Sequence, residues 1–330
     1  YKKKIYIGCI QFIKGDKMTQ AQELFNNLRT YINSQIIGQP KLIDRLLIAR
    51  LSDGHMLVEG APGLAKTKVV KTLSNLIEAQ SHRIQFTPDL LPADITGSDV
   101  FKPETANFYF QKGPIFHNLI LADEINRTSP KTQSALLEVM EERRVTIEGY
   151  VHEVPKPFVV IATQNPAGSA GTQPLPDSQV DRFMICLHMG YPEPADEISV
   201  LKSRTEENPL DQVRAVMSKQ ELLALQELVS KVYVKDEIYD YIVTLINKTR
   251  NHDLIRMGVS PRGSISLLRM AQGMAFLSGR DYVIPRDVRD VFMDVCGHRI
   301  FLNAKARLEG SDKERILSDI LNHTKEPRLF

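Results

Sequence analysis

The residues with the clearest chemical potential form the stretch Gly60-Ala61-Pro62-Gly63-Leu64-Ala65-Lys66-Thr67. This stretch follows an apolar run at 55–59 and leads into residues 68–73, as expected for a strand, a glycine-rich turn and the start of a helix. Such a turn directs successive backbone N–H groups inward, and the helix N-terminus adds a partial positive charge. The pattern predicts a phosphate-binding loop in which Lys66 reaches the β- and γ-phosphates and the Thr67 hydroxyl binds Mg²⁺.

Ala65 is the one departure from the usual loop pattern, which has glycine immediately before the lysine. Alanine disfavours positive φ and places a methyl group near the phosphates. An ordinary glycine-containing turn between a strand and a helix is the alternative, and further residues are needed to decide.

Two acids follow a second apolar run, at the end of Leu119-Ile120-Leu121-Ala122-Asp123-Glu124. The pattern places Asp123 at the mouth of a strand, where it can hold the Mg²⁺ shell, and positions Glu124 to polarise the attacking water. Asn165 ends the next buried run and can orient the same water, although Asn-Pro is also a simple turn signal. A solvated strand end is the alternative for the acid pair, but the preceding phosphate loop favours catalysis.

The composition is that of an ordinary globular protein, with 330 residues, 42% hydrophobic and 25% charged, and room for two domains. The formal net charge of +2 implies no strong attraction to nucleic acid or to an anionic membrane. The cysteines at positions 9, 186 and 296 are far apart and form no CxxC pair, which argues against disulfides or a zinc site and favours the reducing cytoplasm. No run of about 18 apolar residues is present, so we expect no membrane span.

Hydrophobic periodicity predicts an α/β core followed by helices. Helices are expected at 19–33, from Pro40 to residue 48, and at 132–142, and strands at 55–59, 82–86, 118–122, 158–163 and 183–187. The alternation of strands and helices implies a parallel sheet covered on both faces. Residues 87–113 are expected to be an insertion within this domain, and 144–154 a β-hairpin.

The composition shifts at Gly190-Tyr191-Pro192-Glu193-Pro194, a candidate hinge, and the pattern is helical afterwards, including 220–232, 236–249, 263–277 and 285–296. We therefore expect three parts. A loose extension at 1–17, upstream of Met18, precedes a nucleotide-binding core at 18–190 and a helical domain at 191–330.

Five motifs, GAPGLAKT, LILADEINR, ATQNP, VDRFM and SPRG, occur in this order, and together they resemble the MoxR family of AAA+ ATPases. The resemblance extends from about Ile36 to about Asn303. It implies a P-loop AAA+ core, a parallel sheet sandwiched by helices, followed by an all-α lid. GLAKT is the family's own form of the loop, which accounts for Ala65.

The resemblance also implies roles for individual residues. Asn165 would be sensor 1, and Arg182 would be the arginine finger that reaches a neighbouring subunit's ATP. Arg262 would be sensor 2 and would reach back from the lid to the γ-phosphate. Loss of that contact on hydrolysis would let the lid rotate about the hinge. Without the resemblance, both arginines are better interpreted as surface or salt-bridge residues. Nucleotide contacts would come from Ile36, Ile37 and Gly38 near the adenine and from Gly60, Ala61, Pro62, Gly63, Leu64, Ala65, Lys66, Thr67 and Lys68 in the loop. Thr67 and Asp123 would bind the metal, and Glu124 would be the catalytic carboxylate that polarises the water.

The expected function is Mg²⁺-dependent ATP hydrolysis that drives chaperone-like remodelling or activation of a partner protein. The resemblance implies a hexameric homo-oligomer and a client carrying a von Willebrand factor A domain. Two alternatives remain: a chelatase-type or nucleic-acid-associated AAA+ motor, and an ATP-binding switch with little turnover. A nucleic-acid partner is disfavoured because the basic residues of the 144–154 hairpin stand among glutamates.

Overall fold

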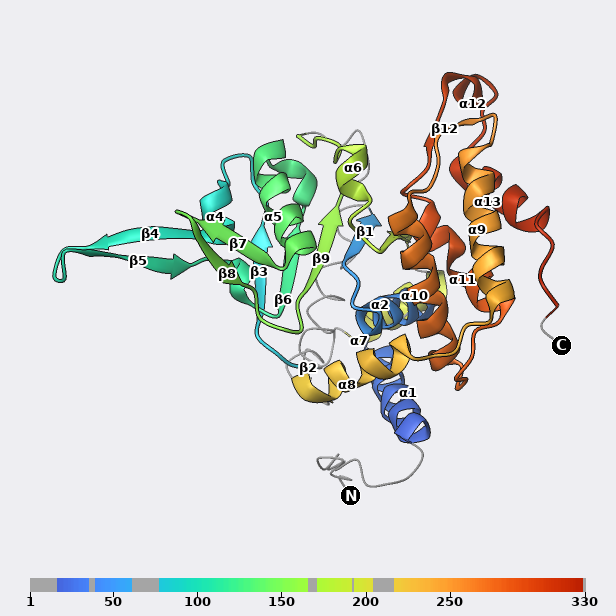
Figure 1. Ribbon diagram of the computed structural model, residues 1–330, viewed down its shortest axis with the longest axis horizontal. Coiled ribbons are helices and arrows are strands. Elements are labelled where there is room, and N and C mark those ends of the chain that lie inside the picture. Colours follow the sequence, from blue (N-terminus) through green and yellow to red (C-terminus); the bar gives the residue numbers. More distant parts are fainter. Residues whose placement is uncertain are drawn as a thin grey trace.

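The computed structural model describes residues 17–35, 39–60, 77–165, 171–191, 193–203 and 217–328. Its centre is a parallel sheet in the order β10-β1-β9-β6-β3 (Figure 1). The five strands are β1 (Met56–Gly60), β3 (Ser81–Gln85), β6 (Leu119–Asp123), β9 (Val159–Gln164) and β10 (Ile185–Met189). All five predicted strands are confirmed within a few residues. Because the strands are parallel, their carboxyl ends lie at one edge of the sheet, which we call the strand-end edge, and their amino ends at the opposite, strand-start edge.

Side chains alternate between two hydrophobic layers on this sheet. Leu57, Ile120 and Val160 pack on one face against α5 (Pro130–Glu142), near α4 (Pro92–Thr96). Val58 and Ile161 pack on the other face, in a layer shared with α1 (Lys17–Gln35), α2 (Pro40–Leu51) and the C-terminal helices. The first two helices and the lid therefore cover the same face of the sheet, and core and lid share one continuous hydrophobic layer.

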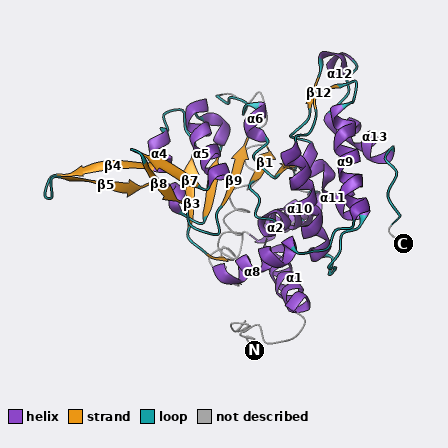
Figure 2. Ribbon diagram, viewed as in Figure 1, coloured by secondary structure: helices purple, strands orange, loops and turns teal. Residues whose placement is uncertain are grey.

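The C-terminal half is mainly helical, as predicted (Figure 2). Several helices begin at side-chain caps: Ser218 and Glu221 form a capping box, and the Ser260 hydroxyl accepts from the Gly263 N–H. The helices are α7 (Pro194–Ser203), α8 (Lys219–Ser230), α9 (Asp236–Arg250), α10 (Pro261–Leu277), α11 (Pro285–Cys296), α12 (Ala304–Leu308) and α13 (Lys313–Asn322). Two short strand pairs were not predicted: β12 (Ile255–Met257) with β13 (Phe301–Leu302), and β2 (Ile77–Glu78) with β11 (Met217–Ser218).

Two antiparallel hairpins leave the core. The inserted segment forms β4 (Gly97–Lys102) and β5 (Asn107–Lys112), which project far from the sheet in Figure 1. The second, predicted hairpin is β7 (Arg144–Ile147) with β8 (Tyr150–Glu153). They pack together where Phe110 stacks on His152, with ring centroids 4.1 Å apart. Short helical turns complete the core: η1 (Pro114–Phe116), η2 (Ile125–Arg127) and α6 (Asp177–Val180).

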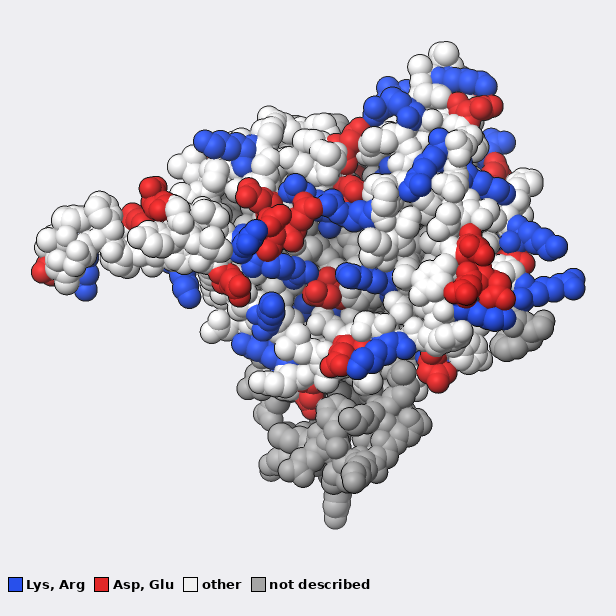
Figure 3. Space-filling model, viewed as in Figure 1, with Lys and Arg blue, Asp and Glu red and all other residues white. Residues whose placement is uncertain are grey.

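The charge distribution of the molecule is mixed. On the face seen in Figure 3, acidic and basic side chains are interspersed over core and lid, and the tip of the β4–β5 hairpin also carries both signs of charge, with Lys102 paired to Glu104. Among the described helices, none combines the length and the apolar character that crossing a membrane requires.

Candidate active site

The acid pair lies at the strand-end edge, as predicted. The strand β6 is buried along its whole length and ends at Asp123, which is itself 5% exposed. Arg83 of β3 donates to the Asp123 Oδ2 atom, with Nη2 at 2.6 Å, and the Thr163 hydroxyl of β9 donates to Oδ1 at 2.5 Å. Both flanking strands therefore fix the orientation of the buried carboxylate.

Glu124 adopts a left-handed backbone conformation, with φ 57° and ψ 47°. A non-glycine residue in this region is strained, and such strain persists only where the surroundings hold it. The Glu124 N–H donates to the Thr163 hydroxyl at 2.9 Å, so one hydroxyl links the backbone of Glu124 to the carboxylate of Asp123. The turn directs the Glu124 side chain away from the buried strand and toward the neighbouring strand ends.

The Glu124 carboxylate is held by side chains from both sides. Asn165 donates from Nδ2 to Oε1 at 3.2 Å, while Gln85 and Arg127 donate to Oε2 at 3.0 and 2.9 Å. Burial raises the pKa of Glu124, but the hydrogen bonds from Arg127 and Asn165 outweigh this effect and leave the pKa below its ordinary value. Glu124 is therefore a carboxylate at neutral pH, able to accept a hydrogen bond from a water molecule.

Asn165 is positioned through Asn126 of η2. The Asn126 amide donates to the Asn165 carbonyl at 3.0 Å and its Oδ1 accepts from the Asn165 N–H at 3.4 Å. The predicted trio of Asp123, Glu124 and Asn165 is thus brought together at one point. Sequence reasoning missed the side chains that hold it, Arg83, Gln85, Asn126, Arg127 and Thr163. Alternation along β3 and β9 could have suggested Gln85 and Thr163, because both stand at strand ends beside β6.

The remaining predicted nucleotide contacts are only partly described. Gly60 ends β1 at the same edge as Asp123, where the predicted phosphate loop follows. The other residues predicted for the nucleotide or the metal, Ile36, Ile37, Gly38, Ala61, Pro62, Gly63, Leu64, Ala65, Lys66, Thr67 and Lys68, lie outside the described residues.

Arg182 and Arg262 lie together elsewhere. Both guanidinium groups bind the carboxylate of Glu141, at the C-terminal end of α5: Arg182 Nε lies 3.1 Å from Oε2, and Arg262 Nη2 binds Oε1. Arg262 also lies 3.7 Å from Asp181. A cavity of about 210 Å³ opens here, and its lining includes Arg143 and these three partners, Glu141, Arg182 and Arg262.

This arginine cavity is at the strand-start edge. Its other lining residues include Gly54 and His55, which immediately precede β1, and Met184, which immediately precedes β10. Strands of five residues, at about 3.3 Å per residue, separate the two edges by roughly 15 Å. In this structure Arg262 lies beside Arg182, across the sheet from Glu124, and its contact with the nucleotide of its own chain stays a prediction.

A buried polar network fixes the lid against the core at this edge. Asp181 accepts from the Ser260 hydroxyl and from Arg299 Nε at 2.8 Å. Arg299 is 3% exposed and also donates to the carbonyl oxygens of Phe183 and Met184. Because Ser260 caps the helix that carries Arg262, the network sets the position of that arginine relative to Arg182.

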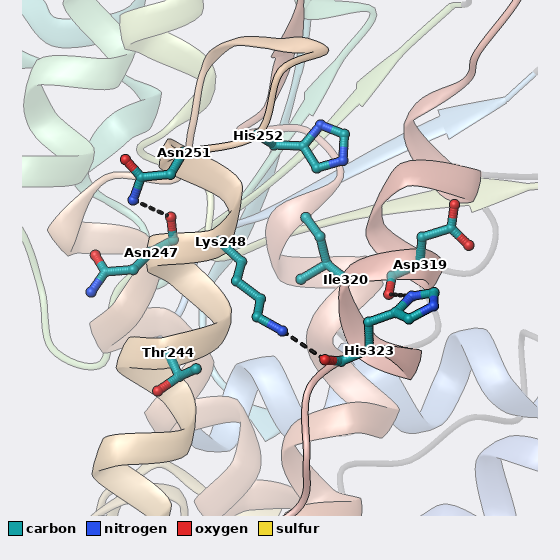
Figure 4. Close-up of a pocket in the computed structure, with 8 residues that line it drawn as sticks. All are labelled: Thr244, Asn247, Lys248, Asn251, His252, Asp319, Ile320 and His323. Atoms are coloured by element: carbon teal, nitrogen blue, oxygen red, sulfur yellow. Dashed lines mark hydrogen bonds between the residues drawn. The ribbon is translucent and has the colours of Figure 1, made fainter.

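Two further cavities are present, and the lining of neither includes Asp123 or Glu124. One of about 490 Å³ lies between α9 and α13 of the lid, where the Lys248 ammonium donates to the His323 carbonyl at 2.7 Å (Figure 4). The other, of about 440 Å³, lies between the strand-end edge and the lid, and its lining includes Asn165, His188 and Lys313.

Comparisons with known proteins agree with this architecture. Residues 55–185 match the family described as ATPase family associated with various cellular activities (AAA), and residues 247–320 match the AAA lid domain. Protein YeaC of Bacillus subtilis is 45% identical over 90% of this chain and 93% of its own. Chaperone MoxR1 of Mycobacterium tuberculosis is 40% identical over 89% of this chain and 80% of its own.

A solved structure has the same fold. The crystal structure of a protein from Cytophaga hutchinsonii, assigned there as a candidate ATPase, superposes with a TM-score of 0.87 at 39% identity, covering 94% of this chain and 97% of its own. The fold is that of an AAA+ domain followed by a lid, and the protein is an ATPase. The chain belongs to the MoxR family of AAA+ ATPases.

Proposed function

We propose that this protein hydrolyses ATP with Mg²⁺ in a ring of identical subunits, each active site being completed by arginines of the next subunit, and that it uses hydrolysis to remodel a partner protein. The observation that carries the proposal is that the water-activating residues and the arginines lie at opposite edges of the sheet. Glu124 and Asn165 lie at one edge of the sheet, and Arg182 with Arg262 at the other.

At the strand-end edge, the chain supplies water activation. Glu124 accepts a hydrogen bond from the attacking water, and Asn165 fixes the direction of its carboxylate. Asp123, with the Thr67 hydroxyl of the predicted loop, offers the hard oxygen ligands that Mg²⁺ prefers. Mg²⁺, when bound, would neutralise charge on the phosphates.

At the strand-start edge, the chain supplies positive charge to a neighbour. The transferring phosphoryl group carries negative charge on its oxygens, and guanidinium groups bind such oxygens in a planar fork. An arginine supplied from another subunit is worth about 10³–10⁵ in rate in phosphate-transferring switches. Assembly would therefore be a condition of turnover.

A protein client is supported by surface chemistry and by one relative. The projecting β4–β5 hairpin exposes Phe101, Phe108 and Tyr109, with Phe108 70% exposed, and exposed aromatic groups favour protein contacts. MoxR1 is a chaperone by name. A hexameric ring, a client with a von Willebrand factor A domain and a cytoplasmic location stay predictions.

The test is turnover in mixtures of two inactive variants. Glu124→Gln removes water activation but keeps the arginines, whereas Arg182→Ala keeps water activation and removes the arginine given to the neighbour. Each alone should be inactive. A random equal mixture should recover about one quarter of the wild-type rate, because that fraction of interfaces pairs an intact Glu124 with an intact Arg182.

The matched control is Arg144→Ala, an exposed arginine outside the arginine cavity that pairs with Glu142. It should keep the wild-type rate. An Arg182→Ala variant that is active alone, with equal mixtures that run at half its rate, would mean that each subunit hydrolyses ATP by itself. A DNA or RNA motor would instead show salt-dependent nucleic-acid binding by fluorescence anisotropy, which we do not expect.

A further inference from the structure

Glu141 binds the two arginines with one oxygen each. Oε2 forms an ion pair with Arg182 Nε at 3.1 Å, and Oε1 accepts a hydrogen bond from Arg262 Nη2. The arginines come from different parts of the molecule, Arg182 from the core just before β10 and Arg262 from the first turn of α10 in the lid. One carboxylate therefore sets the spacing between the two guanidinium groups.

This spacing suits a phosphoryl group as well as a carboxylate. Both anions present neighbouring oxygens at a similar separation, which is why guanidinium groups bind either of them in a fork. Two arginines held on one carboxylate are thus already arranged to bind two oxygens of one phosphoryl group. The Glu141 side chain is 38% exposed, so a phosphate arriving from solvent or from a neighbour has access.

The charges around the cavity favour this exchange. Its lining includes four arginines, at 143, 182, 262 and 269, and two acids, Asp53 and Glu141. Arg143 is engaged by Asp53 at 3.3 Å and by the Phe158 carbonyl, and Asp181 faces Arg262 from the core at 3.7 Å. Glu141 lies between Arg182 and Arg262. An anion that displaces its carboxylate therefore contacts a positively charged surface.

We propose that Glu141 acts as an internal stand-in for the neighbouring subunit's γ-phosphate: it holds Arg182 and Arg262 in place in the unassembled subunit and yields them to the phosphate on assembly. This inference rests on the proposed function, because the phosphate that displaces Glu141 belongs to the ATP of a neighbouring subunit. Glu141 then sets how readily ATP-bound subunits associate, while the chemistry on the assembled ring proceeds through the arginines.

The first experiment compares Glu141→Gln with wild type in ATPase rate per subunit against protein concentration. Glutamine keeps the size of the side chain and removes the charge that competes with phosphate. The protein concentration at half-maximal rate should fall about tenfold, the range of one charge-assisted hydrogen bond, with the maximal rate unchanged. Glu142→Gln is the matched control, because Glu142 is adjacent in sequence but pairs with Arg144 outside the cavity.

The second experiment measures binding without turnover. In a Lys66→Ala background, which weakens the chain's own phosphate loop, calorimetry with inorganic tripolyphosphate measures the arginine cavity of the dilute subunit. Glu141→Gln should tighten binding about tenfold, and adding Arg182→Ala and Arg262→Ala should abolish it. Glu142→Gln should leave it unchanged.

The two ideas fail in different ways. An active Arg182→Ala variant overturns the shared active site, and tripolyphosphate binding still decides the role of Glu141. Unchanged tripolyphosphate affinity in Glu141→Gln overturns the stand-in, even if mixing experiments establish the shared site. A lower maximal rate in Glu141→Gln at saturating protein also overturns it, because Glu141 would then be needed to position the arginines during turnover.

Discussion

The buried imidazole of His55 should make the fold sensitive to acid. His55 immediately precedes β1 and is 6% exposed. Its Nδ1 accepts from the Val160 N–H at 3.0 Å, so Nε2 carries the proton and donates to the Met140 carbonyl at 3.0 Å. Burial, and then the nearby charge of Arg143, lower the pKa of His55 from 6.5 to about 3.

The sign and size of the effect follow from linkage. The unfolded chain binds a proton at His55 near pH 6.5, whereas the folded chain stays neutral until about pH 3. The contribution of this group to stability is therefore complete above pH 6.5 and is lost as the pH falls toward 3. At pH 5 the loss amounts to about 2 kcal/mol.

The assay is urea unfolding of wild type and His55→Gln at pH 8 and at pH 5. The loss in the free energy of unfolding between the two values should be about 2 kcal/mol smaller in the variant, whatever its stability at pH 8. His298, also buried with its pKa lowered well below the ordinary value, is present in both proteins and cancels. Equal losses in the two proteins would refute the reasoning that His55 is neutral and buried.

Three further substitutions test the site and its support. Asn165→Ala should lower kcat about 10²-fold with the KM for ATP unchanged, in steady-state assays, because the Glu124 carboxylate loses its orienting donor. Thr163→Val should lower the free energy of unfolding by about 1–3 kcal/mol in urea, since it leaves Asp123 and the Glu124 N–H without the shared hydroxyl. Arg299→Met should cost about 3–5 kcal/mol by the same measurement, because it removes the buried member of this ion pair and leaves the half-buried Asp181 without a compensating charge; an unchanged midpoint would contradict this network.

The sheet could be predicted from local patterns, and the hairpin within the insertion could not. Near-continuous apolar runs such as 158–163 identify strands buried on both faces, because few other elements tolerate them. Residues 87–113 instead are rich in Pro, Asp and Gly and gave no period. The β4–β5 hairpin forms there because Gly97, at φ 91°, makes a close backbone approach to Gln111 and Gly113 that no Cβ would permit.

The acid pair and Asn165 could be placed in advance because parallel strands bring their carboxyl ends to one edge. Arg262 could not, because its position depends on how the lid packs, and lid packing rests on contacts such as Arg299 with Asp181 between residues more than one hundred positions apart. The role of Glu141 could not be predicted either, since an exposed glutamate in a charged helix end has no distinguishing local signal.

The path of α5 supports the proposal that the arginines serve a different subunit from the one that carries them. The helix begins next to η2, where Gln133 binds the Ile125 carbonyl one residue after Glu124, and it ends at the Glu141 clamp. Its 13 residues span about 20 Å at 1.5 Å per residue. A straight helix packed along the sheet cannot shorten, so motion of the lid alone does not bring Arg182 to its own Glu124. In the proposed assembly, a second copy whose strand-end edge faces this strand-start edge would bring the two groups together, and repetition of that heterologous contact would close a ring when its rotation permits.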